Sequence, residues 1–240
     1  MYNLLNHPCL TINTVKKIAC LISNKGTGTN LQAIVDACKA GKIKGKIVVV
    51  VSNSTNAFGL ERAQKENIPT EIFPWKPYKD SGKSRAAYSK DLAGLLAKKY
   101  NPDIVVLAGW ILILTQEFVK KFPLTINLHP GLIPDKKGGV VYFPDGLAAF
   151  SNEGIHTDNA IKQFLESGCS YAGSTLHLVT ENVDWGPVIE RTFEKIQPND
   201  TVESLYSRLK KKEHQMLVKS LALLSEEKLI IKGGKVIFSK

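Results

Sequence analysis

The 240-residue chain alternates short apolar runs with longer stretches in which apolar residues recur every three or four positions. The short runs predict β-strands, and the longer periodic stretches predict amphipathic helices. The expected strands are Lys17–Ser23, Lys46–Ser52, Thr70–Phe73, Ile104–Ala108, Thr125–Leu128, Ser174–Val179 and Pro187–Ile196, with Lys235–Phe238 as an added edge strand. The expected helices are Leu31–Lys39, Phe58–Glu66, Arg85–Tyr100, Gln116–Lys121, Asn159–Ser167 and Thr201–Leu224.

The regular alternation of strand and helix predicts an α/β fold of the Rossmann-like, doubly wound kind, with a mostly parallel sheet and helices on both faces. The run Ile104–Leu107 is wholly apolar, which suits a central strand buried on both sides. No internal repeat or linker interrupts the pattern, so we expect a single domain over residues 1–240. Within it, residues 1–15 are expected to form an N-terminal extension and residues 135–172 a long inserted loop and helix region.

A formal net charge of +10 indicates an anionic partner. The lysines form short clusters such as Lys210–Lys212 and no long basic tail, so a small phosphorylated substrate is favoured over nucleic acid. The apolar runs are strand-sized and the first residues lack a secretory pattern, so we expect no membrane association and a cytoplasmic location. The four cysteines form no Cys-x-x-Cys pair, which favours neither a zinc site nor a disulfide framework.

A glycine-containing segment joins the first expected strand to the first expected helix. It consists of Gly26, Thr27, Gly28, Thr29 and Asn30. Small residues at such a junction let backbone N–H groups approach a phosphate at the positive end of a helix. The segment matches neither the Walker sequence nor the full dinucleotide fingerprint, and a tight turn that merely needs glycine is the structural alternative.

Asn127 and His129 stand two positions apart at the end of an expected strand, so their side chains share one face of the sheet. His177 and Asp184 follow in a later strand and turn. An amide, an imidazole and a carboxylate together can stabilise an oxyanion and move a proton, as acyl transfer between two nitrogens requires. Two alternatives stay open at this point: an ordinary strand end with a turn aspartate, and a zinc site built from His129, His177 and Asp184.

Five segments in order resemble the phosphoribosylglycinamide formyltransferase family of folate-dependent enzymes. They are Leu21–Ser23 with Gly26–Gln32, Val51–Asn53 with Ala57–Ala63, Leu107–Gly109, Asn127–Pro130, and His177–Thr180 through Asp184–Ile189. The resemblance covers about Ile18 to Leu224. It implies metal-free transfer of a formyl group from 10-formyltetrahydrofolate to the amine of glycinamide ribonucleotide, a step of purine (IMP) synthesis.

The resemblance also implies roles for particular residues. Asn127, His129 and Asp184 would be catalytic, with His177 in support. Gly26, Thr27, Gly28, Thr29, Asn30, Lys210 and Glu213 would bind the phosphate and ribose of the substrate. The expected folate-binding residues are Arg85, Leu107, Trp110, Ile113, Leu114, Phe118, Val119, Asn127 and Asp184. Ordinary core packing is the alternative for the apolar members of this set, and a solvated helix face is the alternative for Lys210.

The chain departs from the family pattern in three places. Leu112 stands where members commonly carry an arginine, so folate contacts there must differ. Asn24-Lys25 looks like an insertion in the glycine segment, and Lys25 is a candidate for a further phosphate contact. The segment between Pro134 and Gly173 is longer than usual, which fits a lid, a reshaped acceptor pocket or an oligomer contact such as a homodimer interface.

These departures leave other acceptors and other functions open as alternatives. The rival enzymes are transferases acting on an amino-sugar nucleotide or on methionyl-tRNA, and a hydrolase that releases formate. Two rivals of another class are a noncatalytic module that binds a phosphorylated ligand and a basic nucleic-acid binder, whose affinity would depend strongly on salt.

Overall fold

The computed structural model describes residues 15–24, 26–152, 157–232 and 235–238. Its centre is a seven-stranded sheet in the order β3-β2-β1-β4-β5-β8-β9. The first five of these strands are parallel to one another, whereas β8 is antiparallel to β5 and β9 is antiparallel to β8. The strands are β1 (Lys16–Ile22), β2 (Gly45–Ser52), β3 (Thr70–Ile72), β4 (Ile104–Leu107), β5 (Thr125–His129), β8 (Tyr171–Leu178) and β9 (Val188–Lys195).

Strand β1 shows how the sheet divides the interior into two cores. Ile18, Cys20 and Ile22 face a core completed by α1 (Thr29–Lys39), α2 (Phe58–Lys65) and α7 (Val202–Ser225). Ala19 and Leu21 face the opposite core, which α4 (Arg85–Lys99) and α5 (Gln116–Lys121) complete. Side chains alternate across a strand, so wholly apolar strands are buried on both faces. The predicted doubly wound α/β fold is confirmed.

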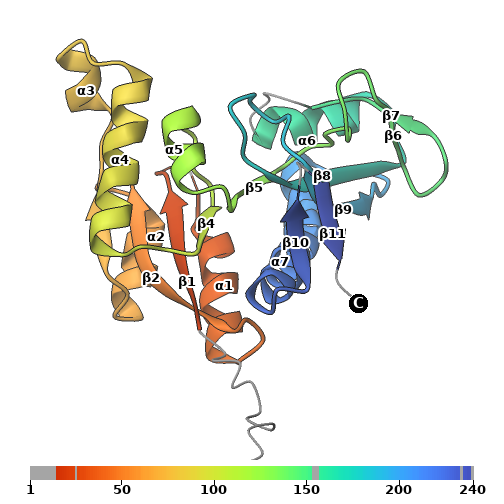
Figure 1. Cartoon of the computed structure of the whole chain (residues 1–240). Helices are drawn as coiled ribbons and strands as arrows, with labels where there is room; N and C mark the ends of the chain where they lie inside the picture. The colour runs from red at the N-terminus through yellow and green to blue at the C-terminus, as the bar shows by residue number, and fades with distance from the viewer. Residues whose placement is uncertain (1–14, 25, 153–156, 233–234, 239–240) are drawn as a thin grey trace, which may run out of the picture.

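The long insertion has a core of its own. It contains the hairpin of β6 (Val141–Tyr142) and β7 (Ala148–Ala149) and the helix α6 (Thr157–Glu166). Phe143 and Phe164 are buried and pack against the first turns of α7 through Leu205 and Leu209. Figure 1 shows these elements at the opposite side of the molecule from α3 (Lys76–Asp80) and α4, with the hairpin projecting outward. The described part of the expected loop and helix region is therefore packed against the sheet and α7.

Several elements differ from the sequence-based expectation. The short helix α3 (Lys76–Asp80) and the β6–β7 hairpin were not expected. The prediction that Lys235–Phe238 extends the main sheet as an edge strand is wrong, because β11 (Lys235–Phe238) pairs with β10 (Leu229–Lys232) in a separate hairpin. Leu229, the first residue of β10, is buried in the core beside α7. Strand β10 is therefore anchored next to this helix, and β11 pairs with β10 instead of with the main sheet.

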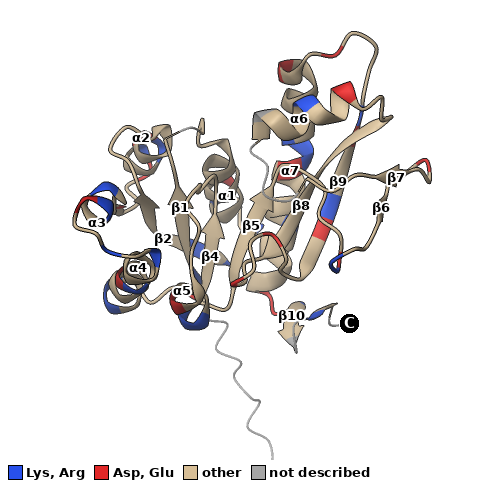
Figure 2. Cartoon of the chain, turned by 90° about the horizontal axis from the view of Figure 1, so that it is seen from above, with Lys and Arg blue, Asp and Glu red and all other residues tan. Residues whose placement is uncertain are grey.

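Charges of both signs are spread over the outer surface. Figure 2 shows lysine and arginine positions on α3, α4, α5 and α6 interspersed with acidic ones. No helix among the described residues is both long enough and apolar enough to cross a membrane.

Two helical glycines offer a matched test of packing. A Cβ on Gly94, in α4, would meet no atom within 4 Å, whereas one on Gly59, in α2, would lie 2.6 Å from the Ile22 side chain. We expect Gly94→Ala to raise the free energy of unfolding by about 0.5–1 kcal/mol, because alanine loses less backbone entropy. Gly59→Ala should lower it by about 1–3 kcal/mol through overpacking. Urea unfolding of both variants measures the difference, and equal effects would contradict the packing at Gly59.

Candidate functional site

The antiparallel pairing of β5 with β8 brings two predicted site residues together. Asn127 lies opposite His177 in the register, and the Asn127 amide nitrogen is 3.1 Å from Nε2 of His177. His177 Nδ1 donates to the carbonyl of Leu178 at 2.8 Å. A neutral imidazole with its proton on Nδ1 accepts at Nε2. The Asn127 amide is therefore the donor in this pair, and its orientation is set by His177.

Asp184 completes the cluster from the turn between β8 and β9. Its backbone has a positive φ of 58°, a conformation that Asp and Asn adopt more readily than most residues. Its carboxylate lies 3.7 Å from His129 Nδ1 and 3.6 Å from His177 Nε2. These separations are longer than hydrogen bonds, as is common for catalytic groups before substrate binds.

Gly186 holds this turn against β8. A Cβ at Gly186 would fall 1.6 Å from the carbonyl oxygen of Leu178, so no side chain fits there. The turn can therefore lie close to β8 only with glycine at this position. This close packing places Asp184 near His129 and His177.

Burial governs the charge of His177. The side chain is almost fully buried, and loss of solvation lowers its pKa. The Asp184 carboxylate acts in the opposite direction and His129 adds to the lowering, but burial is the largest cause. His177 is thus held as a neutral group that orients Asn127, while Asp184 faces both imidazoles.

His129 has a second neighbour that the sequence did not indicate. Its ring is buried, with 5% of the residue exposed, and Nε2 lies 2.8 Å from the backbone oxygen of Asn152 in the insertion. A backbone carbonyl leaves no side-chain signature, so no sequence pattern could have identified this contact.

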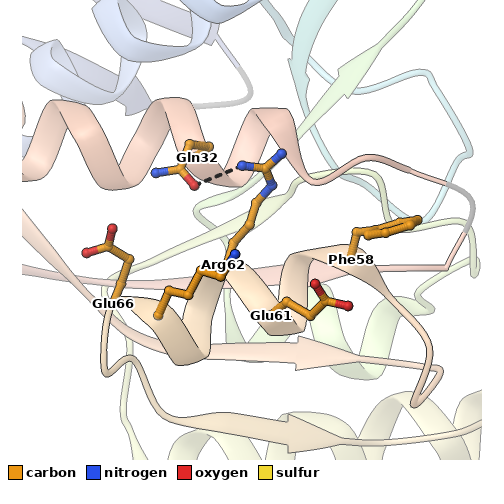
Figure 3. A pocket seen from close by; sticks show the side chains of 6 residues that line it. Gln32, Phe58, Glu61, Arg62 and Glu66 are labelled. Carbon is orange, nitrogen blue, oxygen red and sulfur yellow. Dashed lines mark hydrogen bonds between the residues drawn. The ribbon is translucent and has the colours of Figure 1, made fainter.

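The glycine segment is held in place by α2. Gly28 has a φ of 70° and begins α1, and a Cβ there would lie 2.9 Å from the Cα of Gly59. Arg62 donates from Nε to the carbonyl of Thr27 at 3.0 Å and from Nη1 to Gln32 at 3.1 Å, as Figure 3 shows for the second contact. Arg62 was not among the predicted site residues. Its contact with Thr27 fixes the segment whose N–H groups are expected to face a phosphate.

Two pockets lie on the surface, one beside this segment and one in the insertion. Gln32, Phe58, Glu61, Arg62, Lys65 and Glu66 line a pocket of about 180 Å³ between α1 and α2. A larger pocket of about 440 Å³ lies in the insertion and is lined by Phe150, Ser151, Gln163, Glu166 and Ser167. Neither is lined by the histidines or Asp184, whose side chains are nearly enclosed. Lys25, the candidate for an added phosphate contact, lies outside the described residues.

Lys210 and Glu213 come from α7. Glu213 is fully buried, and burial raises the pKa of its carboxyl to about 7 although the Ser174 hydroxyl donates to it. Ser174 precedes Thr175, which pairs with His129, so Glu213 lies at the same end of the sheet as the candidate catalytic residues. Lys210 Nζ lies 4.4 Å from the centre of the Tyr206 ring and is half-buried.

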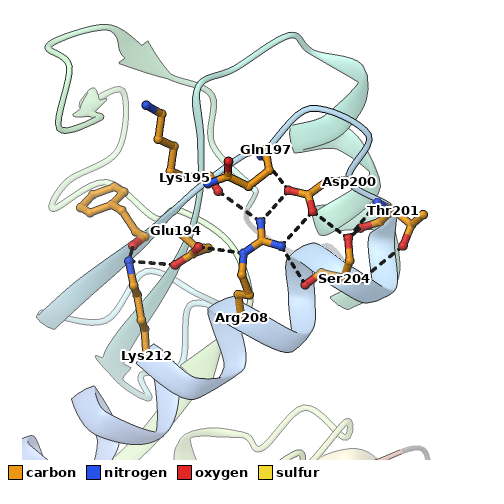
Figure 4. A network of polar contacts seen from close by, with 9 residues as sticks. Glu194, Lys195, Gln197, Asp200, Thr201, Ser204, Arg208 and Lys212 are labelled. Carbon is orange, nitrogen blue, oxygen red and sulfur yellow. Dashed lines mark hydrogen bonds and ion pairs between the residues drawn. The ribbon is translucent and has the colours of Figure 1, made fainter.

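A network of charged groups sets the start of α7. Arg208 donates to both oxygens of Asp200 at 2.8 and 2.6 Å and to Glu194 of β9 at 2.9 Å (Figure 4). Lys212 contacts the other oxygen of Glu194 at 2.8 Å. A capping box between Thr201 and Ser204 closes the helix N-terminus. These contacts join α7 to β9 and so place Lys210 and Glu213 relative to the sheet.

The expected folate residues fall into two groups. Leu107, Leu114 and Phe118 are buried in the second core, and Phe118 packs on Phe122 with ring centres 5.4 Å apart. The positions of these three side chains are explained by ordinary core packing. Ile113 is 55% exposed and Val119 is half-buried, so both have surface to offer a ligand.

Two polar members of the set have unused hydrogen-bond donors. The Trp110 indole Nε1 is buried without a hydrogen-bond partner among the described residues, and the same is true of Arg85 Nη1. The Arg85 guanidinium stacks on Trp75 at 3.9 Å, and burial lowers its pKa. Buried donors of this kind are costly unless a ligand or solvent satisfies them.

No group of three histidine, cysteine, aspartate or glutamate side chains within the described ranges is arranged to hold a metal ion.

Comparison with known proteins identifies the class. Residues 16–221 match the family model described as formyl transferase, and the chain belongs to this family of enzymes. It is 38% identical over 217 residues to phosphoribosylglycinamide formyltransferase of Dictyostelium discoideum, covering 87% of this chain and 97% of that relative. It is 37% identical over 198 residues to the Escherichia coli protein of the same name, covering 82% and 81% of the two chains.

The solved structures agree with this family. The crystal structure of glycinamide ribonucleotide transformylase 1 from Symbiobacterium toebii superposes with a TM-score of 0.79 at 34% identity, over 94% of this chain and 95% of that one. The family resemblance inferred from the five sequence segments is therefore confirmed.

The buried carboxyl of Glu213 makes stability depend on pH. Its pKa rises from 4.5 to about 7 in the folded state, so folding takes up a proton between these values and the wild type loses stability as pH rises through that window. Glu213→Gln still accepts from Ser174 and stays neutral. We expect the free energy of unfolding of the variant to match that of the wild type near pH 4.5 and to exceed it above pH 7 by on the order of 3 kcal/mol. Urea unfolding across pH measures this, and a constant difference would contradict the buried-acid assignment.

Proposed function

We propose that the protein is a phosphoribosylglycinamide formyltransferase, which transfers the formyl group of 10-formyltetrahydrofolate to the amine of glycinamide ribonucleotide. The observation that carries the proposal is the meeting of Asn127, His129, His177 and Asp184 at one end of the sheet. A module that only binds a phosphorylated ligand has no need for a buried carboxylate between two imidazoles. The names of the relatives support the same reaction.

The chemistry needs an oxyanion to be stabilised and one proton to be moved. The substrate amine attacks the formyl carbon, the new C–N bond forms, and negative charge develops on the formyl oxygen. The Asn127 amide, oriented by His177, and the His129 imidazolium stabilise that oxygen. Asp184, whose carboxylate lies 3.7 Å from His129 Nδ1, takes the proton that the amine loses. The proton then passes to the folate nitrogen as the old C–N bond breaks, which yields the formylated ribonucleotide and tetrahydrofolate.

Binding of the two substrates is assigned to separate surfaces. The N-terminal end of α1 and Lys210 would hold the phosphate and ribose together with Glu213. Asn30 Oδ1, which has no hydrogen-bond partner among the described residues, could accept from a ribose hydroxyl. The unused donors of Trp110 and Arg85 and the exposed Ile113 would meet the folate. Leu112 supplies no charge at this surface, and the Arg85 guanidinium is the cation that we assign to the folate.

A sister transferase is the second candidate, and the insertion favours it. This segment reaches the catalytic histidine through Asn152 and so could reshape the acceptor side of the site. Formyl transfer by the purified wild type, assayed with glycinamide ribonucleotide and with amino-sugar nucleotides separately, decides between the candidates. Turnover only with an amino sugar would overturn the proposed acceptor, and formate release without any acceptor would indicate a hydrolase.

Asp184→Asn tests the proton role without disturbing the turn. Asparagine tolerates the positive φ of this position, so the fold should be retained. We expect kcat to fall about a hundredfold or more, while binding of folate changes little. Because the Asp184 charge raises the pKa of His177, its removal should lower that pKa further, which NMR titration detects. Near-normal turnover would exclude Asp184 as the proton carrier.

Lys210→Ala tests the phosphate contact, with the exposed neighbour Lys211→Ala as its matched control. Loss of a charge-assisted hydrogen bond to phosphate should raise the KM for the ribonucleotide about tenfold with kcat largely kept. Lys211→Ala should leave both constants near those of the wild type. Equal effects of the two substitutions would show that only the general positive charge of α7 matters.

A further inference from the structure

The insertion contacts the candidate catalytic residues through Asn152. His129 Nε2 lies 2.8 Å from the backbone oxygen of Asn152. A carbonyl oxygen only accepts, so Nε2 carries a proton and donates it to Asn152. The other ring nitrogen, Nδ1, faces the Asp184 carboxylate at 3.7 Å. With Nε2 committed to a backbone acceptor, Nδ1 is left as the nitrogen that exchanges protons.

Asn152 is firmly anchored. It has no exposed surface. Its backbone N–H donates to the carbonyl of Leu132 at 3.0 Å, and its side-chain oxygen accepts from the Leu132 N–H at 3.1 Å. Its side-chain amide donates to Gln163 of α6 at 3.0 Å. A buried residue with every polar group paired is a fixed part of the structure, which distinguishes it from a loop lying across the site.

Gly131 makes the close approach of Asn152 to His129 possible. A Cβ at this position would fall 2.5 Å from the Cβ of Asn152 and 2.9 Å from Nε2 of His129. Any side chain here would push the insertion away from the ring. The contact between Asn152 and His129 therefore depends on a glycine two residues after the catalytic histidine.

We propose that Asn152 is a positioning residue that fixes the protonation pattern of His129. Its anchored carbonyl holds the Nε2 proton, which fixes the ring orientation and leaves Nδ1 to share its proton with Asp184 and the reacting groups. The insertion thereby acts on the reaction through His129. This inference rests on the proposed function, in which the His129 ring stabilises the formyl oxygen beside Asp184, the proton carrier.

Three variants separate the positioning role from a general effect on folding. Asn152→Ala removes the bonds to the Leu132 N–H and Gln163, whereas Gln163→Ala removes only the second. Asn159→Ala, at an exposed asparagine of α6, is the matched control. The readout is long-range ¹⁵N NMR of the histidine rings in the substrate-free protein, followed with rising pH until the resonances stop shifting. It reports which nitrogen of neutral His129 holds the proton, whatever the acceptor substrate is.

We expect the wild type and Asn159→Ala to show His129 protonated at Nε2. Gln163→Ala should shift the equilibrium partly toward Nδ1 protonation, and Asn152→Ala should shift it further. The same order should hold for kcat, with a fall of about tenfold or more in Asn152→Ala and little change in KM. If Asn152→Ala does not fold, Gln163→Ala carries the test.

Three results would overturn the inference: a wild-type His129 protonated at Nδ1, a tautomer unchanged in the variants that fold, or turnover that rises in Asn152→Ala, since a rise would make the contact inhibitory. The expected tautomer shift without turnover on glycinamide ribonucleotide would uphold the positioning of His129 and refute the proposed acceptor instead.

Discussion

The register of β8 against β5 is the constraint on which the candidate site depends. It places His177 opposite Asn127 and Thr175 opposite His129, and it starts the turn that returns Asp184 to both histidines. A shift by one residue would move each side chain of β8 to the other face of the sheet. Leu176 and Leu178 would then leave the core shared with α7. The hydrophobic pattern that stabilises β8 therefore also fixes the geometry of the candidate catalytic groups.

The residues that form the cluster were predictable because each carries its own chemistry and stands at a strand end or turn. Asn127, His129, His177 and Asp184 were all identified in this way, and the structure brings them together. The glycine segment was predictable because strand, small residues and helix follow one another directly. The order of the first five strands also follows the expected doubly wound pattern.

The supporting contacts were not predictable, because they depend on backbone atoms and on packing between distant segments. Asn152 reaches His129 through a carbonyl, and Arg62 reaches the Thr27 carbonyl from a different helix. The β6–β7 hairpin is too short to show an alternating pattern, and its place is set by Phe143 packing against Phe164 and Phe193. Strand β11 pairs with β10, which is anchored in the core by Leu229. The local sequence pattern of β11 is the same for a strand of this hairpin and for an edge strand of the main sheet.

The buried Glu213 has a consequence for ligand binding as well as for folding. With a pKa near 7, its carboxyl holds a proton for part of the time at neutral pH when no ligand is present. A ligand that brought hydroxyl or ammonium donors to this carboxyl would favour its ionised form and so release the proton into the solvent. If Glu213 takes part in binding as proposed, a more alkaline medium would tighten the complex while the empty protein becomes less stable.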